Sequence, residues 1–283
     1  MSAEPESMHR SKYFLLSLPL AGLLAFAIAG SATGKAPKLS ADEIIAKHVA
    51  SVGTEDARAA LKSRVAQGTV QFSERITGTI HLDGKASIVS QANKVKVAFG
   101  FATPQYPGEQ LVFDGQNVQV ALIDQQSRSR LGNFVVQEPE VLKEGVFGGV
   151  LSMGWPLLDA KGSGVKLKSE GIKKVADREV YVLSYTPKKR NNSGDLSVLL
   201  YFEPATFHHV LTIYRLAAAP VEQGETTDPS SVTTTVEERF EDFRAVDGVT
   251  LPFSWDVRAR VEPGKALEYE WKVTLTSVLH NKI

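Results

Sequence analysis

The sequence predicts a mostly β (α+β) fold, in which a single curved antiparallel sheet forms an open half-barrel with helices packed across its concave face. The first observation behind it is alternation. From Val65 onward, apolar and polar residues alternate in short runs separated by turn signals such as Asp83-Gly84 and Asp114-Gly115, a pattern typical of antiparallel strands and hairpins. The second is number, because about eleven or twelve such runs exceed the usual four to six strands of a flat sheet, so the sheet has to curl.

The N-terminus predicts export. Residues 14–30 form the only long apolar run; Arg10 and Lys12 precede it, and small residues follow up to Ala32. A charged start, an apolar centre and a small-residue exit indicate a secretory signal peptide, and the run is short for a membrane span. The alternative is an uncleaved N-terminal membrane anchor. Both interpretations place the remaining chain outside the cytoplasm, and we expect a periplasmic protein.

The domain organisation follows from this signal. We expect a signal peptide at 1–32, a linker at 33–39 and one half-barrel domain at 40–283, with a helical insertion at about 137–159. Within the domain, Ser40 and Glu43 have the spacing of a capping box, and apolar residues at helical spacing follow until Gly53. A second short helical stretch is expected at 55–63.

The insertion has a composition of its own. It is apolar but contains Gly145, Gly148, Gly149 and Gly154, each of which weakens a helix interior by about 1 kcal/mol. We expect one or two short, deformable helices. They are either an ordinary crossover that fills the core or a mobile lid over the sheet.

Strands resume after the insertion, and the last two are the clearest. We expect strands at 165–171, 179–186, 195–202, 208–216, 232–243, 251–261 and 267–279, with loops at 190–195 and 218–235. In the final hairpin, Arg258 and Arg260 are placed to face Glu268 and Glu270 across the strands. The opposite face of this hairpin is apolar, so each strand has one buried and one wet face.

Large side chains occupy the inward positions of the predicted strands. A curved sheet lined in this way is filled either by its own helices, as an ordinary packed core, or by an apolar ligand. The candidate ligand-binding residues of the sheet are Phe72, Phe99, Phe101, Phe113, Phe253, Trp255, Tyr269 and Trp271.

Composition and motifs give no sign of catalysis. The chain has 283 residues with 32 basic and 32 acidic side chains, and this zero net charge argues against nucleic-acid binding. It has no cysteine, which excludes disulfides, thiolate metal sites and cysteine nucleophiles. Adjacent His208 and His209 point to opposite faces of a strand and cannot chelate one metal together. We interpret the acidic residues at 237–238 and 241–242 as a solvated sheet face. We therefore expect no enzyme activity, no metal and no cofactor.

Several segments resemble a known family. They are ADEIIAKHVASVG at 41–53, FDGQNVQV at 113–120, GIKKVADREVYVLSY at 171–185, YFEPATFHHVLTIYR at 201–215 and FEDFRAVDGVTLPFSW at 240–255. In these segments and in its order of elements, the chain resembles the LolA/LolB-like periplasmic lipoprotein-carrier superfamily, which includes proteins labelled outer-membrane lipoprotein-sorting.

The resemblance implies a function. It implies non-catalytic binding of the acyl chain of a lipid or lipoprotein, for lipoprotein sorting or envelope lipid transport, by a monomer. The lid over the chain would then include Phe147, Leu151, Met153 and Trp155. The alternative is a periplasmic sensor or protein-interaction module, in which the same half-barrel binds an envelope protein partner.

Overall fold

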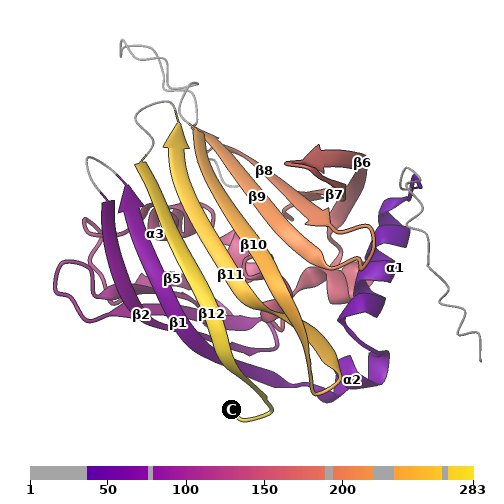
Figure 1. Ribbon diagram of the computed structural model, residues 1–283, viewed down its shortest axis with the longest axis horizontal. Coiled ribbons are helices and arrows are strands. Elements are labelled where there is room, and N and C mark those ends of the chain that lie inside the picture. Colours follow the sequence, from indigo (N-terminus) through magenta and orange to yellow (C-terminus); the bar gives the residue numbers. More distant parts are fainter. Residues whose placement is uncertain (1–36, 76–78, 189–193, 219–232, 263–266) are drawn as a thin grey trace, which may run out of the picture. The chain divides into compact units, whose positions relative to one another are not determined.

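Twelve strands form one antiparallel sheet in the computed structural model of the protein (Figure 1). The structure describes residues 37–75, 79–188, 194–218, 233–262 and 267–283. The strands are β1 (Ser63–Arg75), β2 (Thr79–Gln91), β3 (Lys94–Phe101), β4 (Gly108–Phe113), β5 (Val118–Ala121), β6 (Lys166–Val175), β7 (Arg178–Thr186), β8 (Gly194–Phe202), β9 (His209–Ala218), β10 (Thr233–Val246), β11 (Val249–Glu262) and β12 (Leu267–His280). The predicted signal peptide, most of the linker and the loop residues 190–193 and 219–232 lie outside the described residues.

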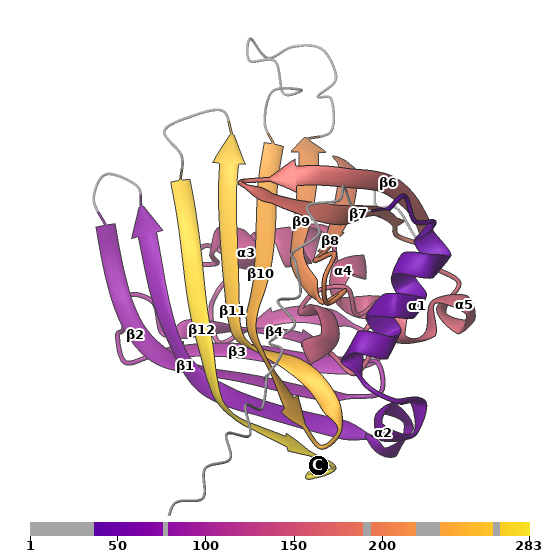
Figure 2. The same cartoon turned by 45° about the vertical axis from the view of Figure 1, so that its right-hand side comes forward.

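The strand order explains where the helical insertion has to run. The order is β5-β4-β3-β2-β1-β12-β11-β10-β9-β8-β7-β6, so the last strand pairs with the first and the sheet stays open, with β5 and β6 as its two edges. These edges are joined in sequence by residues 122–165. This connection therefore has to cross the whole sheet, and it does so on the concave side (Figure 2). The predicted fold class, a curved antiparallel sheet that is not closed into a barrel, is confirmed.

The connection contains several short helices rather than one long one. They are α3 (Arg130–Gln137), α4 (Glu140–Lys143), α5 (Ala160–Ser163) and the 3-10 helices η1 (Gly149–Leu151) and η2 (Pro156–Asp159). The helical part thus begins at Arg130, earlier than the predicted boundary near 137. Ser129 caps α3 by accepting a hydrogen bond from Gly132 N at 3.1 Å. An eight-residue helix spans too few turns to show a helical repeat in the sequence, which is why this start was missed.

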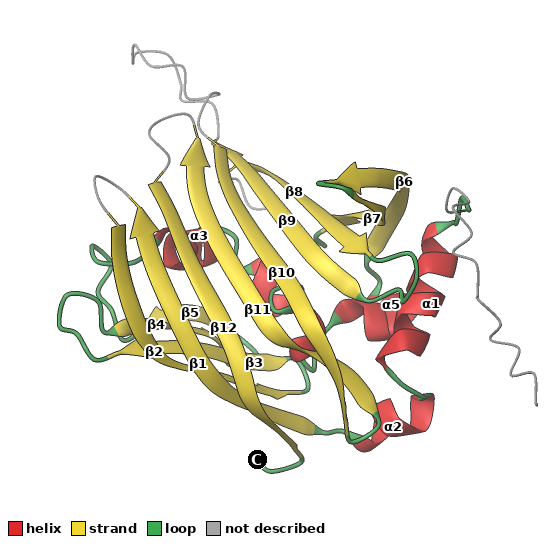
Figure 3. Cartoon of the chain, viewed as in Figure 1, coloured by secondary structure: helices red, strands yellow, loops and turns green. Residues whose placement is uncertain are grey.

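Two helices precede the sheet. In α1 (Ala41–Val52) the predicted capping box is present, since Ser40 Oγ accepts from Glu43 N and Glu43 Oε2 accepts from Ser40 N. Its buried face packs into the core of the sheet. Helix α2 (Glu55–Ala60) ends three residues before the predicted limit because Ser63 already begins β1. Figure 3 shows both helices beside the strands. No helix among the described residues is long and apolar enough to cross a membrane.

The final hairpin places the predicted charged residues opposite one another. Arg258 lies opposite Glu270 and donates to it from Nε at 2.6 Å. Arg260 lies opposite Glu268 in the ladder, but its guanidinium donates to Glu237 of β10 at 2.9 Å. Each of these strands keeps its apolar side chains on the concave face, which sets up the site described next.

Candidate functional site

The aromatic residues predicted to line the sheet meet in one core. The ring centroids of Phe72 and Trp271 are 5.2 Å apart, and the Phe99 ring lies 6.0 Å from Trp271 and 6.1 Å from Trp255. Phe101 and Phe113 are buried in the same cluster, whereas Tyr269 is partly buried at its margin. Phe253 belongs to the cluster but differs from the rest, because the exposed Arg244 guanidinium lies 4.5 Å from its ring centroid.

The residues predicted for the lid pack onto this aromatic face. Phe147, Leu151 and Trp155 are buried, and Met153 is partly buried. The Phe147 ring lies edge-on to Trp255 with 5.5 Å between centroids. The structure thus brings the predicted sheet and lid residues together. It places the insertion itself on the concave face, where an apolar ligand was the alternative occupant.

Glu238 of β10 holds the insertion on the sheet through hydrogen bonds, and the prediction that this residue is solvated was wrong. The predicted solvated acidic face holds for the exposed Glu241 and Asp242, but Glu237 and Glu238 are both buried, and Glu238 wholly so. Its Oε1 accepts from Gly148 N at 2.7 Å and from Trp255 Nε1 at 3.0 Å, and its Oε2 accepts from the Tyr214 hydroxyl at 2.6 Å. Burial raises the pKa of Glu238 to about 7, although these donors oppose the shift.

Trp155 is held by a buried histidine of α1. Trp155 Nε1 donates to His48 Nε2 at 3.0 Å, and His48 Nδ1 lies 3.0 Å from Phe207 O. His48 therefore carries its proton on Nδ1 and is neutral, and burial lowers its pKa to about 4. His209 stacks on Trp155 with 4.9 Å between ring centroids.

The two adjacent histidines lie in different surroundings, although only His209 belongs to β9 (His209–Ala218) and His208 precedes the strand. His209 is buried in the core, while the His208 ring stacks on Phe243 with 4.2 Å between centroids. Within the part of the chain that the structure describes, no group of three or more histidine, cysteine or acidic side chains is arranged to hold a metal ion.

Two further polar contacts hold the same segment. Arg64 of β1 donates from Nη1 to Val150 O and from Nε to His280 Nε2, the latter at 3.0 Å. Burial lowers the pKa of this guanidinium to about 10. Met153 N donates to Ser90 Oγ of β2 at 2.7 Å. Residues 148–155 are thus tethered at Gly148 to β10, at Val150 to β1, at Met153 to β2 and at Trp155 to α1.

The sequence did contain a signal for two of the residues that hold the insertion, Glu238 and Ser90. Glu238 lies between Val236 and Phe240 in the alternation of its strand, so the period of two already placed it inward. Ser90 follows Ala86 and Ile88 in the same way. A polar residue at an inward position is expected to have a buried partner. The partners themselves lie far away in sequence, and only the structure identifies them.

A groove opens beside the end of the tethered segment. It has a volume of about 650 Å³ and lies between α2 and residues 153–159. Leu61, Met153, Trp155 and Leu158 give it apolar walls, while Arg58, Lys62, Glu55 and Asp159 are its charged side chains. Trp155 and Met153 thus have one side toward the core and another toward this groove.

The comparisons with known proteins concern the fold. No protein-family model matches the sequence, and the search of curated proteins gives no match. Among solved structures, the chain is similar to a LolA superfamily protein from Nitrosomonas europaea, with 11% identity and a TM-score of 0.44 over 87% of this chain and 95% of that one. It is also similar to a domain named for outer membrane lipoprotein sorting from Vibrio parahaemolyticus, with 10% identity and a TM-score of 0.44 over 84% and 94% of the two chains.

A third similar structure is a DUF1329 family protein from Desulfovibrio piger, with 11% identity and a TM-score of 0.39 over 85% of this chain and 93% of that one. LolA superfamily structures, to which the sequence segments pointed, are thus among those similar to this chain over most of its length.

Proposed function

We propose that this protein binds the acyl chain of a lipid or lipoprotein, without catalysis, on the concave face of its sheet. The observation that carries the proposal is the aromatic face of the sheet. The segment that covers this face is an insertion of short helices, which is held by hydrogen bonds at four positions. The acyl chain would replace the insertion and contact Phe72, Phe99 and Trp271. The secretory pattern at the N-terminus favours the periplasm as the place of action.

The energetics of such an exchange suit a carrier. Each methylene that leaves water contributes about 0.8 kcal/mol, so about ten methylenes contribute ~8 kcal/mol before ordering costs. Opposing this, the tethers at Gly148, Val150, Met153 and Trp155 have to break. The buried side chains of Phe147 and Leu151 also have to leave the aromatic face, and each loses about 1.5–3 kcal/mol of burial unless it packs elsewhere. A neutral hydrogen bond contributes only about 0.5–1.5 kcal/mol net, and one to a charged group about 1.5–3 kcal/mol. A ligand bound by exchange is held reversibly, and a carrier needs to release its cargo.

Glycines at three turns interrupt the helices of the insertion. Gly145, Gly148 and Gly149 all have positive φ angles, between +51° and +84°. A Cβ at Gly145 would lie 2.2 Å from Gly154 O. Left-handed turns at these positions favour glycine, and they divide the insertion into short pieces. We therefore favour the lid interpretation, with the groove of about 650 Å³ beside Met153 as the opening.

The alternative is a protein partner that adds a strand to the sheet. The two edge strands, β5 and β6, do not favour it. Edge strand β6 carries exposed Lys166, Lys168, Lys173 and Lys174, and its register with β7 shifts at Ser169/Gly171. Lysines and bulges are devices that discourage strand addition. The other edge, β5, has only four residues.

A locked lid tests the proposal. Gly154 and Asn93 adjoin, since a Cβ at Gly154 would lie 3.2 Å from the Cα of Asn93, and the chain has no cysteine of its own to compete for an engineered disulfide between them. We expect saturable binding of a fluorescent hexadecanoic acid to the wild type. The oxidised N93C/G154C variant should lose this binding, and reduction should restore it.

A second disulfide provides the control. Gln71 and Asp83 face each other on exposed positions of β1 and β2, away from the insertion. The oxidised Q71C/D83C variant should bind the probe as the wild type does. Absence of saturable binding to the wild type, or equal binding by the oxidised N93C/G154C variant, would contradict the proposal.

A further inference from the structure

Strands β9 and β10 pair over only part of their length and then diverge. The two strands pair from Thr233↔Ala217 to Arg239↔Leu211, and the pairing stops there. Strand β10 continues to Val246 and remains paired with β11 on its other side. Among the described residues, positions 240–246 of β10 therefore have no strand partner on the β9 side.

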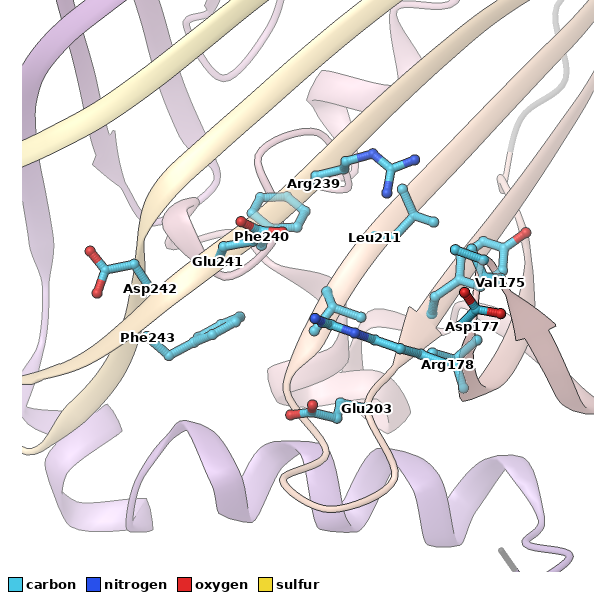
Figure 4. A pocket seen from close by; sticks show the side chains of 14 residues that line it. Val175, Asp177, Arg178, Glu203, Leu211, Arg239, Phe240, Glu241, Asp242 and Phe243 are labelled. Atoms are coloured by element: carbon cyan, nitrogen blue, oxygen red, sulfur yellow. The ribbon is translucent and has the colours of Figure 1, made fainter. Parts of the chain in front are cut away.

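A groove of about 670 Å³ lies where the two strands diverge (Figure 4). Its β10 wall consists of five consecutive residues, 239–243. Alternate residues of a strand point to opposite faces, so a run of consecutive residues indicates that the groove meets the edge of β10 rather than one face. Asp242, with a φ of +54° and no ladder partner in β11, interrupts the pairing of this wall without shifting its register. Backbone groups of an unpaired edge are the ones that an added strand uses.

The floor of the groove is apolar and consists mainly of residues outside the main core, to which, among the described lining residues, only Phe240 and Phe243 of the β10 wall connect it. Val180, Tyr201 and Leu211 line it and belong, with Val182, to a second cluster of buried residues on this side of the sheet. An extended segment in the groove would thus have backbone partners along one wall and apolar contacts below.

The charges in the groove are mainly negative. Its carboxylates are Asp177, Glu203, Glu241 and Asp242, and its guanidiniums are Arg178 and Arg239. Arg239 is paired with Glu237 at 3.3 Å, Asp177 with Lys174 at 3.5 Å and Asp242 with Arg244. Among the described residues, the groove charges outside these pairs are the carboxylates of Glu203 and Glu241 and the guanidinium of Arg178. Figure 4 shows Arg178 extending into the groove from one side, with Glu203 below it and Glu241 on the β10 wall opposite.

We propose that this groove docks an extended segment of a partner protein that carries a basic side chain between apolar ones, and that pairs with residues 240–246 of β10 as an added strand. The partner's backbone supplies ladder hydrogen bonds, and its basic side chain lies near Glu241. This site is on the outer side of the sheet, so it does not compete with an acyl chain on the concave face.

The test uses the full-chain protein and a fluorescein-labelled peptide, acetyl-Thr-Val-Lys-Val-Thr-Val-Thr-amide. We expect saturable binding that weakens at least about threefold when the peptide lysine is replaced by glutamate, and equally when the protein carries Glu241→Lys. The glutamate peptide should regain affinity for the Glu241→Lys protein, because the charges are exchanged. Asp83→Lys, at an exposed position on β2, is the matched control and should leave binding unchanged.

N-methylated peptides test the strand pairing. In a ladder, the N–H groups of alternate residues point to one neighbour, so methylation of one alternate set should abolish binding and methylation of the other should preserve it. The proposal is overturned if the peptide does not saturate the protein up to about 1 mM, if Glu241→Lys behaves like Asp83→Lys, or if both methylated sets bind like the parent peptide. Binding of the hexadecanoic acid probe by Glu241→Lys should equal that of the wild type, so the two proposals fail separately.

Discussion

Replacement of Glu238 by glutamine tests the role assigned to this buried carboxylate. Glutamine fits the site because the Glu238 Oε1 receives both N–H donors, from Gly148 and Trp255, and an amide oxygen accepts both equally well. The Oε2 partner is the hydroxyl of Tyr214, which is able to accept from the glutamine amide instead of donating. The substitution thus removes the charge and keeps the three contacts.

The expected magnitude follows from the raised pKa of Glu238. Burial raises this pKa from 4.5 to about 7, so the folded protein binds the proton more tightly than the unfolded chain does. The stability from this group is therefore fully present below pH 4.5 and is lost as the pH rises to 7. A shift from 4.5 to about 7 corresponds to about 3 kcal/mol. The stability of Glu238→Gln relative to the wild type should rise by this amount between pH 4 and pH 8.

Buried histidines change the free energy of unfolding with pH in the opposite direction. The test therefore has to compare Glu238→Gln with the wild type at each pH. Burial lowers the pKa of His48 to about 4 and that of His209 well below its ordinary value. Their contribution to stability is present above pH 6.5 and is lost as the pH falls through the folded pKa. The wild-type profile mixes both effects, whereas the subtraction of Glu238→Gln cancels the histidines.

Urea unfolding measured by tryptophan fluorescence at half-unit steps from pH 4 to pH 8 checks this, because all three tryptophans are buried. Glu238→Leu serves as the control, since it leaves the donors of Gly148, Trp255 and Tyr214 unpaired and should be destabilising at every pH. A constant difference between Glu238→Gln and the wild type across this range would refute the reasoning.

Two further predictions concern the tethered segment. Trp155→Phe should lower the free energy of unfolding by about 1–3 kcal/mol, because it leaves His48 Nε2 buried without a donor; a urea midpoint equal to that of the wild type would contradict this. Gly148→Ala should cost about 1–2 kcal/mol for its left-handed backbone alone, since no atom lies within 4 Å of its Cβ position. Gly145→Ala should cost more, because its Cβ would collide with Gly154 O, and equal melting temperatures of the two variants would argue against the collision.

The strands were readable from the sequence where the pattern was local. The last hairpin was predicted with its apolar and charged faces, and with Arg258 and Arg260 facing Glu268 and Glu270, because alternation and turn residues are local signals. The individual pairs, such as Arg258 with Glu270, come from the structure. The pairing of β1 with β12 was not predicted, since it joins residues about two hundred positions apart and no local pattern encodes it. The burial of Glu238 was missed for a related reason. A carboxylate is tolerated inside only where donors converge on it, and these come from three distant segments.

The strand order connects the two interpretations that the sequence left open for the insertion, crossover or lid. Because β1 pairs with β12, the edges β5 and β6 come to opposite ends of the sheet, and the chain between them has to traverse the aromatic face. A segment in that position is core when it is closed. It becomes a lid if a ligand offers the same face equivalent apolar contacts. Affinity for an acyl chain is then a difference between two sets of contacts, so weakening the tethers should strengthen binding while it weakens the fold. Trp155→Phe should therefore lower the urea midpoint and tighten the binding of the hexadecanoic acid probe, whereas a variant that loses stability and affinity together would indicate that Trp155 contacts the ligand itself.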